Sequence, residues 1–233
     1  MENLMLKYFE TRIKSENEIS EPGPVITISR EYGCPSKILA QILVDKLNVL
    51  DQEGHSHPAR WKWISRELLE EAARDLRVEP RDINHIFNYQ ERSIIDDVLA
   101  ATKKDGSYKP DHAIKKSVGK VIRAFGDRGH VVIVGRAGVV LTRDIKKSLH
   151  IRLMAPLDWR INRTMQVQKL SKENALDLIT SKDANRKRFL EYYLGQKFQI
   201  QMFDIVYNCH NFTLEEIADS IILSANVRKM IRD

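Results

Sequence analysis

Basic residues follow an apolar run near the start of this chain, in a loop whose residues suit phosphate binding. Residues 29–37 read Ser-Arg-Glu-Tyr-Gly-Cys-Pro-Ser-Lys, between the β-branched run Pro24–Ser29 and apolar residues at helical spacing. A loop that leads from a strand into a helix presents unpaired backbone N–H groups, which bind phosphate. Arg30 and Lys37 add positive charge. An ordinary turn fits the same residues, because the loop lacks the Gly-x-x-x-x-Gly-Lys-[Ser/Thr] pattern.

A second arginine lies in a glycine-flanked turn after another apolar run. Val131–Val134 is followed by Gly135, Arg136, Ala137 and Gly138. Glycines let the backbone approach a ligand closely, and a guanidinium group holds a phosphate through two hydrogen bonds. The pattern therefore favours a second phosphate contact, and a turn with a solvent-facing arginine is the alternative.

A third set of charged residues has helical spacing. Arg160 and Arg163 are three residues apart, as are Asp183 and Arg186, so each pair shares a helix face, whereas Arg188 lies on a different face from Arg186. A solvated helix with internal ion pairs would carry the same residues. Several arginines after separate strands nevertheless favour phosphoryl transfer, which depends more on cationic positioning than on covalent chemistry.

The elements that position these residues alternate along the chain, which indicates an α/β fold. We expect strands at Pro24–Ser29, Trp61–Ile64, Val131–Val134, Leu149–Met154 and Phe203–Tyr207. We expect helices after residue 37, after Ser65, at Asp82–Ala101, Ala113–Phe125 and Trp159–Gln168, from Ser171 to about Tyr193, and at Leu214–Met230. Such alternation predicts a parallel sheet of about five strands with helices on both faces, and ligands bind beyond the carboxyl ends of its strands.

Length and composition set the class of protein. The 233 residues suffice for one large domain, and 42% hydrophobic with 30% charged residues is typical of a globular protein. No apolar stretch approaches the roughly 18 residues of a membrane span, and the charged N-terminus does not predict a secretory signal. Two cysteines, Cys34 and Cys209, are too few for a disulfide framework, so we expect a cytoplasmic protein.

The charge pattern and the N-terminal segment indicate which binding partners to expect. The net charge of +6 arises from 38 basic residues mixed with 32 acidic ones, so we expect a solvated surface and no nucleic acid partner. Residues 1–22 form an expected arm, because Leu4, Met5, Tyr8 and Phe9 make a helical stripe that a proline- and glycine-containing stretch ends. The arm would pack on the domain, residues 23–233, or on a second copy of the chain.

In their order, the motifs resemble the cytidylate kinase-like family of P-loop nucleoside monophosphate kinases. The resembling stretches are Ile26–Gly33, Val132–Arg136, Ala155–Arg163, Asp183–Arg186, Tyr192–Gly195 and Phe203–Asn208. Each stretch is modest alone, but their order from about Pro24 to Ile222 is much more specific. The resemblance implies a three-layer, P-loop NTPase-like sheet with a helical acceptor-binding region at about residues 61–125 and a lid at about residues 160–198.

The resemblance also implies a reaction and its residues. Members of the family transfer the terminal phosphoryl group of ATP to a nucleoside monophosphate with Mg²⁺, and CMP or dCMP is the usual acceptor. Arg136 resembles the arginine that holds the acceptor, and Asp183 and Arg186 match the lid. The implied catalytic residues are Lys37, Arg136, Arg160, Asp183 and Arg186; those that bind substrate are Arg136, Arg163, Asp183 and Arg188; those that bind ATP are Arg30, Gly33, Cys34, Pro35, Ser36 and Lys37.

The phosphate loop departs from the family pattern. Family members usually read Ser-Arg-x-x-Gly-Ser-Gly-Gly, where this chain has Gly33-Cys34-Pro35-Ser36. Pro35 donates no backbone N–H, which should weaken ATP binding, while Ser36 is a candidate Mg²⁺ ligand or helix cap. The chain is therefore a kinase with an altered loop, a nucleotide sensor or scaffold without turnover, or a kinase with a non-nucleotide acceptor. Cys34 is either a reactive thiol or a small residue that fills a narrow site.

Overall fold

The computed structural model describes residues 23–54, 61–65, 119 and 122–231. The chain divides into two compact units, one formed by Met1–Asn17 with Arg66–Ala124 and the other by Glu18–Ser65 with Phe125–Asp233. Nearly all described residues belong to the second unit. The predicted arm, the helix predicted after Ser65 and the helix predicted at Asp82–Ala101 lie outside the described residues. The predicted helix Ala113–Phe125 is described continuously only from Ile122, and it runs to Arg128.

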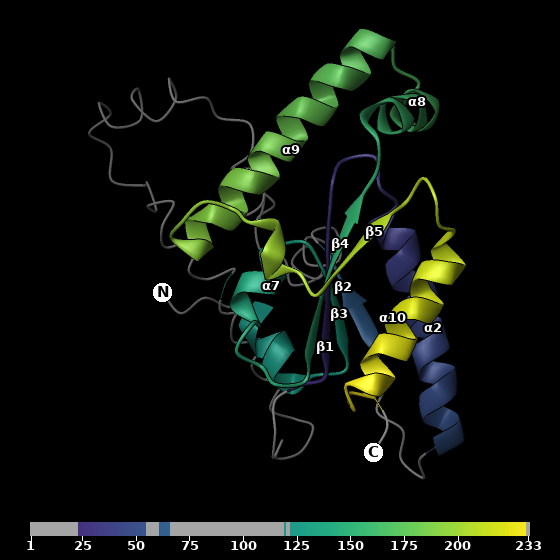
Figure 1. Cartoon of the computed structure of the whole chain (residues 1–233), viewed down its shortest axis with the longest axis vertical. Coiled ribbons are helices and arrows are strands. Elements are labelled where there is room, and N and C mark those ends of the chain that lie inside the picture. Colours follow the sequence, from purple (N-terminus) through teal and green to yellow (C-terminus); the bar gives the residue numbers. More distant parts are fainter. Residues whose placement is uncertain (1–22, 55–60, 66–118, 120–121, 232–233) are drawn as a thin grey trace, which may run out of the picture. The chain divides into compact units, whose positions relative to one another are not determined.

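A five-stranded parallel sheet forms the centre of this unit, with the strand order β2-β3-β1-β4-β5 (Figure 1). The strands are β1 (Val25–Arg30), β2 (Lys62–Ile64), β3 (Val131–Val134), β4 (Ser148–Met154) and β5 (Ile205–Asn208). The predicted sheet of about five parallel strands is therefore confirmed. Because all the strands run the same way, their carboxyl ends and the loops after them meet at one edge.

Helices cover both faces of the sheet, so the predicted three-layer arrangement is confirmed. The helices are α2 (Ser36–Gly54), α7 (Gly138–Leu141), α8 (Leu157–Gln168), α9 (Lys172–Leu194) and α10 (Leu214–Val227), with a 3-10 turn η1 (Ile200–Met202). In Figure 1, α2 and α10 lie together on one side of the strands and α7 lies on the other, while α8 and α9 follow the carboxyl end of β4. Across the described residues, no helix combines the length and apolarity that a bilayer crossing requires.

Hydrophobic clusters among the described residues hold these elements together. The larger cluster joins the sheet to α2 and α10, and Ile28, Leu43 and Ile221 within it are fully buried. A smaller cluster on the α7 side is built from Val139 of α7, Leu190 of α9 and Phe203. The near-continuous burial of β1 follows from its central place in the sheet, because both of its faces are covered.

Local signals set the ends of the long helices. The Ser171 side chain caps α9 by accepting a hydrogen bond from Asn174 N, and Gly195 ends it in a left-handed conformation with φ 69°. Thr213 and Glu216 form a reciprocal capping box at the start of α10. These caps agree with the predicted helix starting at Ser171 and the predicted closing helix.

Two predicted boundaries near the C-terminus are wrong by a few residues. The last strand begins at Ile205 and not at Phe203, because η1 precedes it and the Phe203 N–H closes that turn on Ile200 O at 3.1 Å. The closing helix ends at Val227 and not at Met230, and Lys229 has a positive φ of 52° that a helix cannot continue. Both errors come from extending an apolar pattern past a turn.

Polar groups connect β1 and β4 on the α7 side of the sheet. The ring of His150, itself 6% exposed, lies 2.8 Å from Thr27 Oγ1 through Nδ1 and 3.3 Å from Ser148 Oγ through Nε2. Burial lowers the pKa of His150 from 6.5 to about 4, Asp204 opposes this change, and Arg228 and Arg143 add to it. His150 is therefore neutral in the folded protein at neutral pH.

We expect the folded protein to lose stability as the pH falls from about 6.5 to about 4. Over that interval the unfolded chain binds a proton at His150 that the folded chain excludes, which costs about 3 kcal/mol of unfolding free energy. Urea unfolding at a series of pH values measures the change. His150→Gln should lose this part of the pH dependence, whereas His210→Gln, a change at an exposed histidine, should keep it. Equal pH dependence in all three proteins would contradict the expectation.

Candidate functional site

The loop between β1 and α2 lies directly against α8, and Gly33 makes this possible. Gly33 has a positive φ of 95°, and a Cβ at this position would lie 3.1 Å from Arg160 Cβ. Within the loop, the Cys34 N–H donates to Glu31 O at 3.3 Å and the Ser36 N–H donates to Cys34 O at 2.9 Å. A glycine at position 33 adopts this backbone angle without strain and leaves room for α8, whereas a larger residue would do neither.

Asp183 of α9 connects this loop to the helices. One oxygen of its carboxylate accepts a hydrogen bond from Tyr32 N at 2.7 Å, and the other accepts one from Arg160 Nη1 at 2.7 Å. Arg160 also donates to Tyr32 O at 3.3 Å, and its Nε lies 3.3 Å from Glu31 Oε2. Arg160 is only 8% exposed, so it acts as a positioning residue for the loop, and a direct catalytic role stays a prediction.

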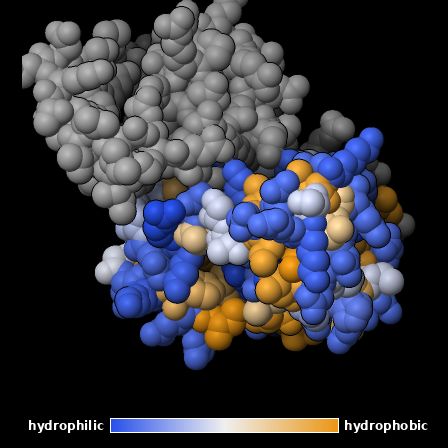
Figure 2. Space-filling model, turned by 90° about the horizontal axis from the view of Figure 1, so that it is seen from above, coloured by the Kyte–Doolittle hydropathy of each residue, from blue (hydrophilic) through white to orange (hydrophobic). Residues whose placement is uncertain are grey.

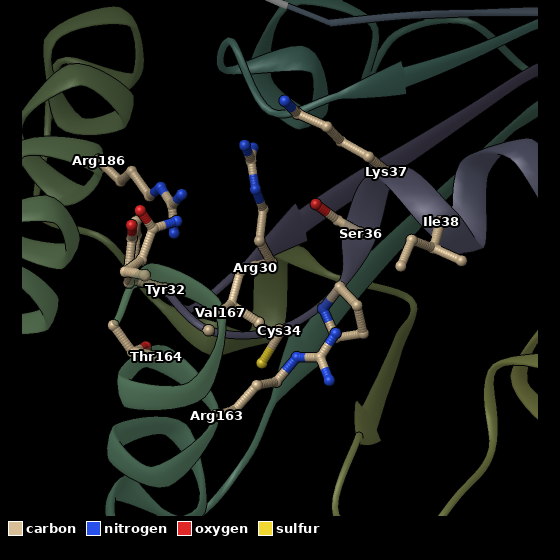
Figure 3. Close-up of a pocket in the computed structure, with 13 residues that line it drawn as sticks. Arg30, Tyr32, Cys34, Ser36, Lys37, Ile38, Arg163, Thr164, Val167 and Arg186 are labelled. Atoms are coloured by element: carbon tan, nitrogen blue, oxygen red, sulfur yellow. The ribbon is translucent and has the colours of Figure 1, made fainter. Parts of the chain in front are cut away.

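A cavity of about 270 Å³ opens between the loop, α8 and α9 (Figure 3). Its lining consists of Arg30, Tyr32, Gly33, Cys34, Pro35, Ser36, Lys37, Ile38, Arg163, Thr164, Val167, Gln168 and Arg186. Four of these side chains are cationic and none of these lining residues is a carboxylate. In Figure 3, Arg186 and Arg163 extend toward the loop from their two helices. Such a lining suits a polyanion.

Arg186 faces the loop with an unsatisfied donor. Its Cζ lies 5.2 Å from the centre of the Tyr32 ring, and its Nη1 lies 3.6 Å from Asp183 Oδ1. Burial lowers the pKa of Arg186 below its ordinary value, and the Asp183 carboxylate opposes this change. Nη1 of Arg186 and Oγ1 of Thr164 are both buried without a hydrogen-bond partner. Buried polar atoms are normally paired, so these two atoms are available to hydrogen-bond a ligand in the cavity.

Arg30 joins the β1 loop to the loop after β3. A Cβ at Gly135 would lie 2.2 Å from Arg30 Nη1, so the guanidinium group of Arg30 packs directly on the glycine backbone. Gly135 also has a positive φ of 77°, which a glycine adopts without strain. The two strand-end loops predicted to bind phosphate are therefore in contact.

Arg136 and Arg188 lie outside the lining of the cavity. Arg136 has an unusual positive φ of 55°, and its Cζ lies 5.7 Å from the ring of Phe189, which is three residues after Arg186 on α9. Residues three apart are neighbours on a helix, so Arg136 approaches the same side of α9 as Arg186. The exposed Arg188 donates a hydrogen bond to Asn185 within α9. Their substrate-binding roles stay predictions.

Cys34 is a buried thiol with no sign of thiolate character. Its pKa is raised because its side chain shares a hydrogen bond with Cys209 and because it is buried. Both cysteines are free and both belong to the main hydrophobic cluster. These properties fit the interpretation of Cys34 as a small residue in a narrow site and not as a reactive thiolate.

The described residues offer few candidate ligands for a metal ion. They contain no group of three or more His, Cys, Asp or Glu side chains arranged around a metal. Ser36, the predicted Mg²⁺ ligand, is 4% exposed and lines the cavity. Since Mg²⁺ is often held by phosphate oxygens with few protein ligands, one hydroxyl fits a metal that arrives with a nucleotide.

Several residues that form the site are not identified by sequence reasoning. Glu31 and Tyr32 lie in the predicted loop, but nothing local shows that their contacts reach α8 and α9. Thr164 follows Arg160 by four residues, so the helix-face argument that paired the arginines could have found it. Arg152, at the carboxyl end of β4, donates to Ser29 Oγ at 2.9 Å, and its only sequence signal is a charge inside an apolar run.

Fold and site together define an α/β protein with the layout of P-loop NTPases and a cavity with a cationic lining beside the loop after its first strand. The chain belongs to the cytidylate kinase-like family, whose model matches residues 25–211. A cytidylate kinase from Sulfolobus acidocaldarius is 30% identical over 205 residues, which cover 88% of this chain and 94% of that protein.

Two further proteins show a weaker likeness to this chain. A crystal structure of an uncharacterized protein from Eubacterium ventriosum matches with a TM-score of 0.61 and 21% identity, over 87% of this chain and 98% of that one. At this identity the likeness shows the fold alone. A uronate isomerase from Corynebacterium glutamicum is 28% identical over 103 residues, which are 44% of this chain and only 20% of that protein.

We expect Asp183→Asn to lower the unfolding free energy by about 2 kcal/mol, because it removes the charge that holds Arg160 and Tyr32 N together. The carboxylate is 28% exposed, so the expected loss is smaller than for a fully buried pair. Asp219→Asn is the matched control, since its ion pair with Lys46 is exposed; it should cost less than about 1 kcal/mol. Urea unfolding of both variants measures the difference, and equal losses would contradict the role given to Asp183.

Proposed function

We propose that this protein transfers the terminal phosphoryl group of ATP to a nucleoside monophosphate, with CMP or dCMP as the favoured acceptor. The observation that carries the proposal is the cavity with four cationic side chains, at the helix N-terminus that follows β1. The family and the named relative support a nucleotide kinase-like function. ATP use is also consistent with the cytoplasmic location expected from the sequence.

The loop after β1, helix α8 and helix α9 each place at least one cationic side chain at the same edge of the sheet. Arg30 and Lys37 come from the loop, Arg163 from α8 and Arg186 from α9, and their charges would neutralise the phosphates. Phosphoryl transfer gains most from such positioned cations, because charge is spread over the oxygens of the moving group. Arg136, at the end of β3, would hold the phosphate of the acceptor, as the family resemblance implies.

Mg²⁺ would neutralise phosphate charge when it is bound with the nucleotide. The chain would contribute the Ser36 hydroxyl at the start of α2, and the loop would orient the phosphates against that helix. The residues of the chain then do three things: they bind the phosphates, orient them and exclude water from the cavity.

A second candidate function is nucleotide binding without turnover, and the altered loop favours it. Pro35 has no N–H, and the N–H groups of Tyr32, Cys34 and Ser36 are already bonded within the protein. Fewer backbone donors thus reach a phosphate than in a glycine-rich loop. One charge-assisted hydrogen bond lost costs about 1.5–3 kcal/mol, or roughly ten- to a hundredfold in affinity.

We expect the full-length protein to form ADP from ATP and Mg²⁺ in the presence of one pyrimidine nucleoside monophosphate. Arg186→Ala should lower kcat/KM by at least about a hundredfold, because arginines that contact the moving phosphoryl group contribute that much or more. Lys187→Ala is the matched control, since Lys187 is an exposed neighbour on α9. A coupled assay of ADP release over a panel of monophosphates measures both.

Three outcomes separate the candidates. Turnover that collapses in Arg186→Ala but persists in Lys187→Ala supports the kinase. Thermal stabilisation by nucleotides without turnover supports the binding protein. An unchanged melting temperature with every nucleotide at millimolar concentration contradicts both, because a ligand that binds only the folded state must stabilise it.

A further inference from the structure

Arg152 lies at the carboxyl end of β4 and faces the α7 side of the sheet. It pairs in register with Ser29 of β1, and its Nη1 donates to Ser29 Oγ at 2.9 Å. Two residues earlier, the register partners Thr27 and His150 are also hydrogen-bonded. Alternate residues of a strand share a face, so Arg152 and Thr27 point the same way. Thr27 faces α7, because a Cβ at Gly138 would lie 3.3 Å from Thr27 Cγ2.

The guanidinium group of Arg152 is poorly compensated. It lies over two aromatic rings, with Cζ 5.4 Å from the Phe198 centroid and 5.7 Å from that of Phe203. An arginine has five N–H donors. Among the described residues, its one hydrogen bond is the bond to Ser29, and its Nε is buried without a partner. Burial lowers the pKa of Arg152 below its ordinary value, and the carboxylates of Glu31 and Asp183 oppose this change.

The carboxylates near Arg152 are committed to other arginines. Glu31 and Asp183 both form ion pairs with Arg160, and Asp183 also pairs with Arg186. Arg152 forms no ion pair with any carboxylate that the structure describes. The group therefore has a net charge of +1, because it contains three arginines, Arg152, Arg160 and Arg186, and only two carboxylates. Arg152 is half-buried with its Nε fully buried, and a partly desolvated charge without a counterion is costly, so an anionic ligand would restore the balance.

We propose that Arg152 binds the phosphate of the acceptor, a phosphate monoester dianion, on the α7 side of the sheet. The inference rests on the proposed phosphoryl transfer. Arg152 does not line the cavity at the loop, so it is separate from the donor phosphates. Its ring partners Phe198 and Phe203 pack in one cluster with Val139 of α7. Val139 follows Arg136 by three residues, so the predicted acceptor arginine and the rings beside Arg152 both adjoin α7.

The test compares Arg152→Met with Phe198→Leu in the full-length protein. Arg152→Met keeps an apolar stem and removes the charge, whereas Phe198→Leu removes a stacking partner and keeps it. Isothermal titration with CMP and, separately, with ATP gives the two dissociation constants, and steady-state kinetics gives KM for both substrates. For Arg152→Met we expect the CMP dissociation constant and the acceptor KM to rise by at least about tenfold, with ATP binding unchanged. Phe198→Leu should leave both constants close to those of the wild type.

A purely structural role predicts a different result. Arg152→Met would then lower the melting temperature and leave the CMP dissociation constant unchanged, or it would weaken CMP and ATP equally, and either result overturns the proposal. If Arg152→Met does not fold, Arg152→Lys decides the question. Lysine keeps the charge but lacks the planar, two-pronged donor group, so CMP should bind several-fold more weakly with ATP unchanged. Unchanged CMP binding in a folded Arg152→Lys protein overturns the proposal.

The titrations also separate this proposal from the proposed function. A wild-type protein that binds CMP without turnover contradicts the kinase, yet the comparison of variants still tests Arg152. A wild-type protein that binds neither CMP nor inorganic phosphate overturns both proposals.

Discussion

The site depends on the carboxylate of Asp183, which joins three segments that are distant in sequence. It accepts hydrogen bonds from the Tyr32 backbone and from Arg160, and it lies 3.6 Å from Arg186. The loop after β1 is thereby fixed to α8 and α9, and Arg186 is held over the Tyr32 ring. Because the same carboxylate partly neutralises two arginines, the protein can gather guanidinium groups at one edge of the sheet before an anionic ligand arrives.

Backbone geometry supports this gathering of charge. Gly33 lets the loop approach α8, and Gly135 lets the guanidinium group of Arg30 pack on the turn after β3. Arg136 and Ala137 continue that turn with positive φ angles of 55° and 52°, a conformation that side chains disfavour. Strain of this kind persists where the surrounding structure fixes it, and functional sites are common places for it. The buried atoms without partners, Nη1 of Arg186 and Oγ1 of Thr164, lie beside the loop between β1 and α2.

Figure 2 views the unit from above relative to Figure 1, and its described surface is mostly hydrophilic with apolar side chains grouped within it.

Much of the fold could be predicted because its signals are local. The apolar runs of β1 and β3, the cap at Ser171 and the glycine at 195 mark elements within a few residues of sequence. The start of β5 is predicted two residues early because Phe203 is apolar and buried like a strand residue, although its N–H closes the turn at Ile200–Met202. For the site, sequence reasoning found the residues but not their partners. Nothing within the helix pattern shows that Arg160 turns inward to Glu31 and Asp183 while Arg163 lines the cavity, because those contacts depend on how α8 packs on the loop.

We expect arginines from separate strand ends to converge on the bound phosphates, with the triphosphate on the first turn of α2. A crystal structure of the protein with a non-hydrolysable ATP analogue, Mg²⁺ and CMP tests this claim most directly. The account predicts that the triphosphate lies on residues 33–37 with Lys37 and Arg186 in hydrogen-bond contact, and that Arg136 faces the phosphate of CMP. A triphosphate bound elsewhere, or Arg136 and Arg186 turned to opposite sides of the bound ligands, would contradict it.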